Sequence, residues 1–368
     1  DMIMAGFIGF LDPAKPSAGA AIKSLQEYGV AVKVLTGDNE VVSKKICHDV
    51  GISSDRILLG SDIENMSDEE LGQVVDDVAI FAKLSPMQKA RIVGVLRKKG
   101  HTVGFMGDGI NDAAALKSAD VGISVDTAVD IAKDSADMIL LEKDLMVLRT
   151  GVVYGRVTFG NIMKYIKMTT SGNFGNMLSM LGASIFLPFL PMLPIQILMQ
   201  NMLYDFSQTS IPWDTVDEEY IRKPRIWDTT GLTRYIFTMG PVSSLFDYIT
   251  FAVMFFIFGA NSAAHQSLFQ TGWFVEGLLS QVLVVHMIRT TKIPFIQSRA
   301  ATPVLAMSGI VMALGVALPY TPAGAALKMA PLPLAYFPYL AGILLLYSIA
   351  AHFASNMVER SVIRQASL

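Results

Sequence analysis

The apolar positions divide the chain into two regions with different patterns. Up to about residue 150, short apolar runs alternate with segments in which apolar residues recur at helical spacing. From about residue 165 to about residue 355, long apolar runs follow one another and contain few charged residues. The first pattern is typical of alternating strands and helices, and the second is typical of helices that cross a membrane.

The short apolar runs of the N-terminal region predict strands, and most of them are separated by a predicted helix. The strand candidates are residues 5–10, 30–35, 78–84, 102–106, 120–125 and 137–141. The run at 30–35 is rich in Val and Leu, as expected for a strand that is covered on both faces. Alternating strands and helices predict a doubly wound parallel α/β sheet, whose ligands bind at the carboxyl ends of its strands.

An acidic loop, Gly107-Asp108-Gly109-Ile110-Asn111-Asp112, directly follows the predicted strand at 102–106. Its two carboxylates are four residues apart with an amide between them, which suits a hard cation such as Mg²⁺ beside a phosphate. Its glycines allow the backbone to come close to a ligand. For the loop alone, the alternative is a solvated turn between a strand and a helix.

Two further polar positions follow other predicted strands. Thr36 and Asp38 come after the strand at 30–35 and before a helix, where a hydroxyl can hold a phosphate oxygen; the alternative is that one of them only caps the helix. Lys89 lies in the first turns of the helix that begins at Ser85-Pro86, where a cation can neutralise a phosphate; the alternative is a solvated basic helix. Because all these positions fall at the same edge of the predicted sheet, we interpret them as one site.

The C-terminal region predicts six membrane spans, each near the roughly 20 residues that cross a bilayer. The spans are residues 168–187, 192–211, 235–258, 273–291, 303–320 and 333–354, and an amphipathic stalk at 151–167 precedes them. Basic residues orient the spans by the positive-inside rule. One set of loops and the tail contain Arg222, Lys223, Arg225, Arg234, Arg289, Lys292, Arg299, Arg360 and Arg364, whereas the opposite loops contain only Lys328. The soluble region and the C-terminus are therefore predicted to be cytoplasmic.

Polar side chains within the predicted spans are candidate ion ligands. Asn173 and Asn176 are three residues apart, and Asn201 and Asp205 are four apart, so each pair shares a helical face. Amide and carboxylate oxygens suit Mg²⁺ or Ca²⁺, and the absence of cysteine from the spans argues against copper or zinc. The alternative for the asparagines is hydrogen bonding between helices.

Two other acidic residues fall within spans, and their roles stay open at this point. Asp247 lies in the third span and Glu276 in the fourth. Each is a candidate ion ligand, proton relay or hydrogen-bonded structural acid.

Composition agrees with a membrane protein. The mean hydropathy of +0.45 is too apolar for one soluble domain. The formal net charge of −3 gives no indication of nucleic-acid binding, and the patches of Lys and Arg flank apolar runs, which indicates membrane topology. The single cysteine, Cys47, excludes an internal disulfide.

The chain contains three motifs in a fixed order: Thr36-Gly37-Asp38, Pro86-Met87-Gln88-Lys89 and Gly107–Ala113. In this order they resemble the haloacid-dehalogenase-type phosphorylation domain of P-type ATPases. Residues 132–137 resemble the same family. The resemblance implies a partial domain of this Rossmann-like α/β class at 1–150, the stalk, and an all-α membrane domain of six helices at 168–368. It implies that Asp108 and Asp112 hold the catalytic Mg²⁺ and that Asn111 supports their loop. It also implies that Lys89 balances charge on the phosphate, which Thr36 hydrogen-bonds.

The family's nucleophile, an aspartate in Asp-Lys-Thr-Gly, does not occur in the sequence, nor does the Thr-Gly-Glu loop of the actuator domain. The resemblance places both upstream of Asp1, together with the ATP-binding domain and four membrane helices. We therefore expect this chain to be the last part of a longer enzyme and to be inactive by itself, because it lacks the residue that forms the aspartyl-phosphate.

The membrane region most resembles bacterial magnesium-transporting (type IIIB) P-type ATPases. By that resemblance, Asn173, Asn176, Asn201 and Asp205 fall on ion-binding positions, and Glu276 matches an acidic position less closely. Asn176 stands where calcium pumps carry a glutamate, which favours a single Mg²⁺. The sequence thus predicts part of an ATP-driven Mg²⁺ importer in the lipid of a bacterial inner membrane. The alternatives are a Ca²⁺ or H⁺ pump, and a membrane-anchored phosphatase or non-catalytic remnant.

Overall fold

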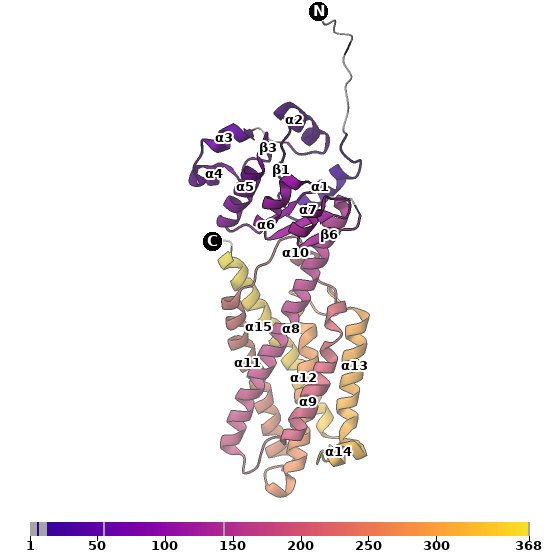
Figure 1. The fold of residues 1–368 in the computed structure, drawn as a ribbon. Coiled ribbons are helices and arrows are strands. Elements are labelled where there is room, and N and C mark those ends of the chain that lie inside the picture. Colours follow the sequence, from indigo (N-terminus) through magenta and orange to yellow (C-terminus); the bar gives the residue numbers. More distant parts are fainter. Residues whose placement is uncertain (1–5, 7–12, 54–55, 143, 367–368) are drawn as a thin grey trace, which may run out of the picture. The chain divides into compact units, whose positions relative to one another are not determined.

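The computed structural model describes residues 6, 13–53, 56–142 and 144–366, and its elements are labelled in Figure 1. The chain separates into two compact units, Asp1–Tyr154 and Gly155–Leu368. The long helix α8 (Leu145–Phe186) begins in the first unit and continues through the second.

The first unit is α/β, and its strands are short and parallel. Its strands are β1 (Val34–Leu35), β2 (Ile57–Leu59), β3 (Ile80–Ala82), β4 (Gly104–Met106), β5 (Val121–Val125) and β6 (Met138–Leu140). Its helices before α8 are α1 (Ala18–Glu27), α2 (Glu40–Asp49), α3 (Gly60–Glu64), α4 (Asp68–Val74), α5 (Pro86–Lys98), η1 (Ile110–Asp112), α6 (Ala113–Ser118) and α7 (Asp130–Ser135). The strand predicted at 5–10 lies outside the described residues, apart from Gly6.

The predicted single sheet is replaced, among the described strands, by two three-stranded sheets in the orders β1-β3-β2 and β4-β5-β6. Neither β1 nor β4 has a second strand partner in the described part of the chain, so one edge of each is unpaired among the described strands. The two sheets share packing nevertheless, because Leu35 at the end of β1 contacts the apolar core of each. β2 was not predicted, because three apolar residues within a polar stretch give too short a pattern to indicate a strand.

Local sequence signals explain where the helices of this unit begin. The hydroxyl of Ser85 accepts the backbone N–H of Gln88, whose side chain returns a bond to the Ser85 N–H. Ser67 and Glu70 form the same reciprocal pair at the start of α4. These caps fix the first turns of the helices, and in α5 the first turn carries Lys89.

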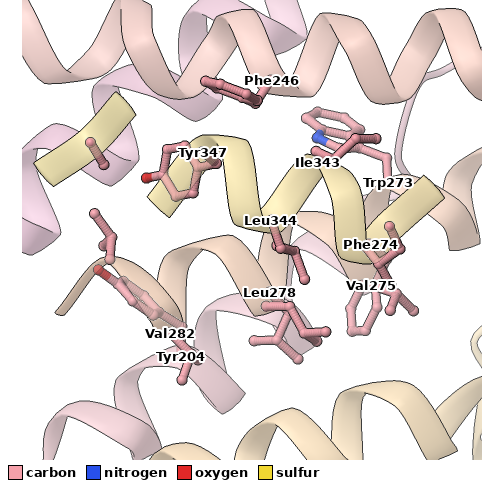
Figure 2. Packing of buried hydrophobic residues seen from close by; sticks show 14 of the residues in the cluster. Tyr204, Phe246, Trp273, Phe274, Val275, Leu278, Val282, Ile343, Leu344 and Tyr347 are labelled. Carbon is pink, nitrogen blue, oxygen red and sulfur yellow. The ribbon is translucent and has the colours of Figure 1, made fainter. Parts of the chain in front are cut away.

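The second unit is helical. After α8 it contains α9 (Pro194–Gln208), η2 (Ile211–Trp213), α10 (Glu218–Ile221), α11 (Thr229–Ala252), the π-helical turn η3 (Val253–Ile257), η4 (Ala263–His265), α12 (Gln266–Ile288), α13 (Thr302–Ala317), η5 (Leu318–Tyr320), α14 (Pro322–Ala326) and α15 (Tyr336–Ala366). Helix α12 packs against α9, α11, α13 and α15. Figure 2 shows one layer of this core, in which Tyr204, Phe246, Leu278 and Tyr347 come from four different helices.

Four helical segments among the described residues are long and apolar enough to cross a membrane: Thr229–Ile257, Ala263–Ile288, Thr302–Tyr320 and Tyr336–Ser361. They correspond to the last four predicted spans. The first two predicted spans are not confirmed. The span at 168–187 falls in the polar-rich C-terminal half of α8, and α9 has only 15 residues, from Pro194 to Gln208.

Candidate functional site

The acidic loop after β4 is organised around Asp112. The ammonium group of Lys89 lies 2.8 Å from Oδ1 of Asp112, and the backbone N–H of Gly109 donates to Oδ2 at 3.1 Å. The Lys89 and Asp112 side chains are only 12% and 13% exposed. The two carboxylate oxygens are thus each fixed by a donor, and a buried cation compensates the negative charge.

Gly107 is required by the tight path of this loop. A Cβ atom at Gly107 would lie 2.5 Å from the Cβ of Asp112, which is closer than carbon atoms pack. The Gly107 carbonyl accepts the hydroxyl of the buried Ser124 on β5 at 2.9 Å. The glycine therefore lets the backbone pass directly against the acidic side chain, while β5 holds that backbone in place.

Asp108, the other acid of the loop, borders a cavity. The cavity has a volume of about 370 Å³, and Met106 and Gly107 at the end of β4 also line it. Its lining also includes Lys15 and Ser17, before and at the start of α1, and Asp144. Ser17 donates to the Asp144 carboxylate at 3.1 Å, so polar groups line part of an otherwise apolar cavity at the carboxyl ends of β4, β5 and β6.

The Thr36-Gly37-Asp38 segment forms its own turn at the end of β1. The Thr36 hydroxyl donates to Oδ2 of Asp38 at 2.9 Å and accepts the Asp38 N–H at 3.1 Å. The cap of α2 is Asn39, whose side chain accepts the N–H groups of Val41 and Val42. Helix capping therefore does not account for Thr36 or Asp38, which was the alternative interpretation of both residues.

The donor set suits Mg²⁺, which prefers carboxylate oxygens and keeps several of its ligands as water or phosphate oxygens. No group of three or more His, Cys, Asp or Glu side chains that could hold a metal occurs among the described residues. A metal at Asp108 and Asp112 would therefore take its remaining ligands from backbone, water or phosphate. Asn111, between the two acids, is exposed in the short helix η1.

In the second unit, the four predicted ion ligands lie toward the outside. Asn173 on α8 and Asp205 on α9 are exposed, whereas Asn176 and Asn201 are half-buried. The side chains next to Asp205 are also exposed and apolar, with Met202 at 56% and Phe206 at 59%. Within the described part of the chain, these four polar side chains are not brought together into a closed site.

The two acids whose roles were open are instead buried at the centre of the helices. Oδ2 of Asp247 accepts the Ser179 hydroxyl at 2.5 Å, and Oδ1 accepts the Trp273 indole N–H at 2.9 Å. Glu276 on α12 is 1% exposed, and neither of its carboxyl oxygens has a hydrogen-bond partner among the described residues. Asp247 is thus bound into the helix packing by two hydrogen bonds, and Glu276 lies next to it.

Sequence reasoning missed a third group, which centres on Asp214 between η2 and α10. Lys164 on α8 and Arg289 after α12 both bond Oδ2 of Asp214, at 2.7 and 2.9 Å. The Asp214 and Arg289 side chains are each 2% exposed. The only signal in the sequence was a lysine in the amphipathic stalk, since Arg289 was counted among the charges that orient the spans.

Comparison with known proteins identifies the family. Residues 4–120 match the haloacid dehalogenase-like hydrolases, and residues 189–355 match the C-terminus of cation transporting ATPases. The magnesium-transporting ATPase, P-type 1, of Salmonella typhimurium is 59% identical over 351 residues, which is 95% of this chain and 39% of that protein. The chain belongs to the P-type ATPases. Its counterpart in Escherichia coli, also called magnesium-transporting ATPase, P-type 1, is 54% identical over 98% of this chain and 40% of its own length.

Similarity to calcium-transporting P-type ATPases is lower. The calcium-transporting ATPase of Bacillus subtilis is 37% identical over 61% of this chain and 26% of its own length. This P-type ATPase chain spans about two-fifths of the length of the magnesium-transporting relatives it matches, 39% and 40%. The haloacid dehalogenase-like assignment of the first unit agrees with the sequence resemblance and with the parallel strands.

Proposed function

We propose that this chain is the C-terminal part of an ATP-driven Mg²⁺ importer that works through an aspartyl-phosphate. The observation that carries the proposal is the buried Lys89–Asp112 pair at the end of β4, in a chain that is 59% identical to a magnesium-transporting P-type ATPase. The nucleophilic aspartate and the ATP-binding domain would belong to an upstream segment. ATP would phosphorylate that aspartate, and the resulting state would drive transport.

The catalytic Mg²⁺ would be held by Asp108 and Asp112, and when bound it would neutralise charge on the transferred phosphoryl group. Lys89 orients Asp112 and supplies a second positive charge at the same edge of the sheet. The Thr36 hydroxyl, at the end of β1 and before α2, would donate to a phosphate oxygen. This role requires the hydroxyl to turn away from Asp38, which it contacts in the present structure.

The open edges of β1 and β4 support the place of the missing nucleophile. A strand that ends in the phosphorylated aspartate would pair with one of these edges and complete a single sheet, as the sequence predicts. The carboxyl end of such a strand would bring the aspartate beside Asp108 and the cavity that Asp108 lines.

The transported Mg²⁺ would be bound by Asn173, Asn176, Asn201 and Asp205, with Glu276 and Asp247 as further candidates. The apolar residues around Asp205 are exposed in this unit, which supports the presence of upstream helices that would cover them. With α8 and α9 crossing the membrane within such a bundle, the chain would contribute six spans to a multi-pass protein. We place it in a bacterial inner membrane, with the α/β unit and the C-terminus in the cytoplasm.

A Ca²⁺ pump is the second candidate, because the chain is also 37% identical to a calcium-transporting ATPase over 230 residues. The small number of carboxylates among the predicted ion ligands favours Mg²⁺ over Ca²⁺. Asp205 is the only acid among the four predicted ligands, and two Ca²⁺ ions would each need six to eight oxygen ligands.

The test uses the full-length protein, including its upstream segment, reconstituted in vesicles with ATP outside. Mg²⁺ on the ATP side is fixed at a saturating level, so that the catalytic cofactor is constant, and Mg²⁺ inside the vesicles is varied. We expect ATP hydrolysis and Mg²⁺ efflux from the vesicles to rise together. Asp205→Asn should lower the apparent affinity for the internal Mg²⁺, and Asp108→Asn should abolish the phosphoenzyme.

The matched control is Glu219→Gln, which removes an acid that is 70% exposed on α10. Stimulation by internal Ca²⁺ and not by Mg²⁺ would favour the calcium alternative. A full-length protein that never forms a phosphoenzyme would contradict the proposal and favour a non-catalytic role.

A further inference from the structure

The buried face of helix α9 is polar, whereas its exposed face is apolar. The buried positions recur every four residues and are at most 4% exposed: Gln196, Gln200, Tyr204 and Gln208. The exposed positions between them carry large apolar side chains: Ile195, Leu198, Met202 and Phe206. In a membrane bundle, polar side chains that face the interior mark the route of a transported ion unless they only hold helices together. The contacts of each side chain separate these two roles.

Gln196, at the start of this face, has a structural role. Its Oε1 accepts the backbone N–H of Leu193 at 3.1 Å, and its Nε2 donates to the Leu327 carbonyl, just after α14, at 3.0 Å. Both parts of the amide are therefore used to cap α9 and to bind a loop. Gln196 supplies a comparison for the residues further along the helix.

Helices α9 and α12 run in the same direction and have a defined register. A Cβ at Gly277 of α12 would lie 2.7 Å from Nε2 of Gln200, so these two residues are opposite each other. The segments that follow the two helices are joined by the bond between Arg289 and Asp214 at 2.9 Å. Because both helices end at the same side, each turn after Gln200 on α9 is level with a turn after Gly277 on α12.

Gln281 of α12 is buried at this contact without a hydrogen bond. It lies one turn after Gly277, on the same face of the helix, and is therefore level with Tyr204. It is 5% exposed, and neither its amide oxygen nor its amide nitrogen has a partner among the described residues. A buried amide without partners destabilises the folded protein, so its presence at this position points to a role in binding.

Helix α8 forms the third side of this polar region. A Cβ at Gly172 would lie 3.6 Å from the Tyr204 hydroxyl, and that hydroxyl lies beside the amide of Gln208. Gln208 in turn accepts the Thr169 hydroxyl at 3.1 Å. Neutral oxygen atoms from α8, α9 and α12 are thus gathered near the level of Tyr204. The next residue, Asp205, is the acid among the four predicted ion ligands.

We propose that Gln281, Tyr204 and Gln208 form an inner site for the transported Mg²⁺, where they hydrogen-bond to the water molecules that the ion keeps. This inference rests on the proposed function and adds these three residues to it. Mg²⁺ gives up its water reluctantly, whereas Ca²⁺ is bound mainly by direct contact with protein oxygens. Neutral amides and a hydroxyl bind coordinated water without replacing it, so this site favours Mg²⁺ over Ca²⁺.

The experiment measures Mg²⁺ efflux from vesicles that contain the full-length protein, with internal Mg²⁺ varied and external Mg²⁺ and ATP fixed. Gln281→Met keeps the approximate volume of the side chain and removes the amide. We expect the apparent affinity for internal Mg²⁺ to fall by about five- to tenfold, which corresponds to the loss of one or two hydrogen bonds. The preference for internal Mg²⁺ over Ca²⁺ should fall with it. The melting temperature should stay equal or rise, because a buried amide without partners is removed.

Gln196→Met is the matched control on the same helix face, because the Gln196 amide is used for packing. It should lower the melting temperature and leave both the affinity and the preference for Mg²⁺ unchanged. Gln281→Glu restores an oxygen and adds a charge at the proposed site. It should therefore recover affinity for internal Mg²⁺ and raise the stimulation of ATP hydrolysis by internal Ca²⁺.

Wild-type affinity and ion preference in Gln281→Met would overturn the inference. A loss of affinity that accompanies an equally lowered melting temperature in Gln281→Met and Gln196→Met would also overturn it, because the role would then be structural. If Gln281→Met does not fold, Tyr204→Phe, which removes only a hydroxyl, decides by the same two measurements. A wild-type protein that moves no Mg²⁺ would refute the proposed function first, whereas normal transport by both the wild type and Gln281→Met would refute only the inner site.

Discussion

The Lys89 ammonium group and the Asp112 carboxylate form an ion pair of 2.8 Å at the end of β4, and both side chains are almost buried. The pair joins the first turn of α5 to the loop that follows a strand of the other sheet. Twenty-three residues separate the two side chains, so the fold and not the local sequence creates the contact. The pair sets the direction in which Asp112 presents its oxygens.

Replacement of Lys89 by Met should therefore impair phosphoryl transfer more than folding. The variant keeps the length of the side chain and removes the cation that holds Asp112 and that, in the proposed site, would face the phosphate. We expect phosphoenzyme formation from ATP in the full-length protein to slow by about 10²–10³-fold. The measurement is rapid-quench labelling with radioactive ATP.

Lys98 provides the matched control in the same helix. Its side chain is 73% exposed and pairs with Asp68, so Lys98→Met should leave the labelling rate nearly unchanged. Equal rates for Lys89→Met and Lys98→Met would remove Lys89 from the phosphate site.

Two glycines of the first unit should respond in opposite directions to alanine. At Gly107 a Cβ would collide with Asp112 at 2.5 Å, whereas at Gly94, inside α5, a Cβ meets nothing within 4 Å. Gly94→Ala should stabilise the protein by about 0.5–1 kcal/mol, because alanine loses less backbone entropy in a helix. Gly107→Ala should lower the thermal stability and the affinity for catalytic Mg²⁺.

Thermal unfolding followed by fluorescence, with and without Mg²⁺, measures both glycine variants. A Gly107→Ala protein with normal stability and normal Mg²⁺ dependence would show that the loop has another conformation. Gly94→Ala controls for the effect of adding a methyl group elsewhere in the unit.

The residues at the acidic edge were predictable because each follows a strand or begins a helix in the parallel pattern. Asp112 and Lys89 are 23 positions apart, but the rule that ligands meet at the carboxyl ends of parallel strands placed both at the same edge. The rule predicted the edge of the sheet at which the two side chains lie, but it did not predict the 2.8 Å contact between Lys89 and Asp112. It also could not show that the described strands form two sheets, since strand pairing depends on which strands are present.

The membrane unit was less predictable, because apolar runs indicate helices without indicating what each helix faces. Arg289 counted correctly as a basic residue at a helix end, yet its side chain is 2% exposed and holds Asp214. The positive-inside rule uses the position of a charge along the chain and contains no information on burial. For the same reason the sequence did not separate the exposed Asp205 from the buried Asp247.

Asp247 and Glu276 should differ in their tolerance of the isosteric amide. Asp247 accepts one hydrogen bond on each carboxylate oxygen, from Ser179 and from Trp273. In Asn, one of these oxygens is replaced by an NH₂ group, which is a donor and would face one of the two donors. Asp247→Asn should therefore destabilise the protein by about 1–3 kcal/mol. Glu276→Gln should change stability by less than about 1 kcal/mol, because no bond to the Glu276 oxygens is lost.

Thermal unfolding in detergent tests the two amide variants, and transport separates stability from function. If Glu276 is an ion ligand, Glu276→Gln will weaken Mg²⁺ transport in a protein that is normally stable. Comparable destabilisation by both variants would mean that Glu276 has partners like those of Asp247.

The stabilisation that the ionised Asp214 carboxylate gives to the folded protein should be lost at low pH. Lys164 and Arg289 hold the pKa of the Asp214 carboxyl below its ordinary value of 3.8, although burial alone would raise it. A carboxyl whose pKa is lowered by folding stabilises the native state fully above the ordinary value, and this contribution is lost as the pH falls through the lower, folded-state pKa. The stability difference between wild type and Asp214→Asn should therefore be constant from about pH 5 to pH 7 and shrink below about pH 4.

Urea unfolding in detergent at several pH values measures this difference in the free energy of unfolding, with Asp217→Asn as the comparison variant. A difference that stays constant down to pH 2.5 would mean that Asp214 is not ionised in the folded protein, or that its partners do not stabilise the charge.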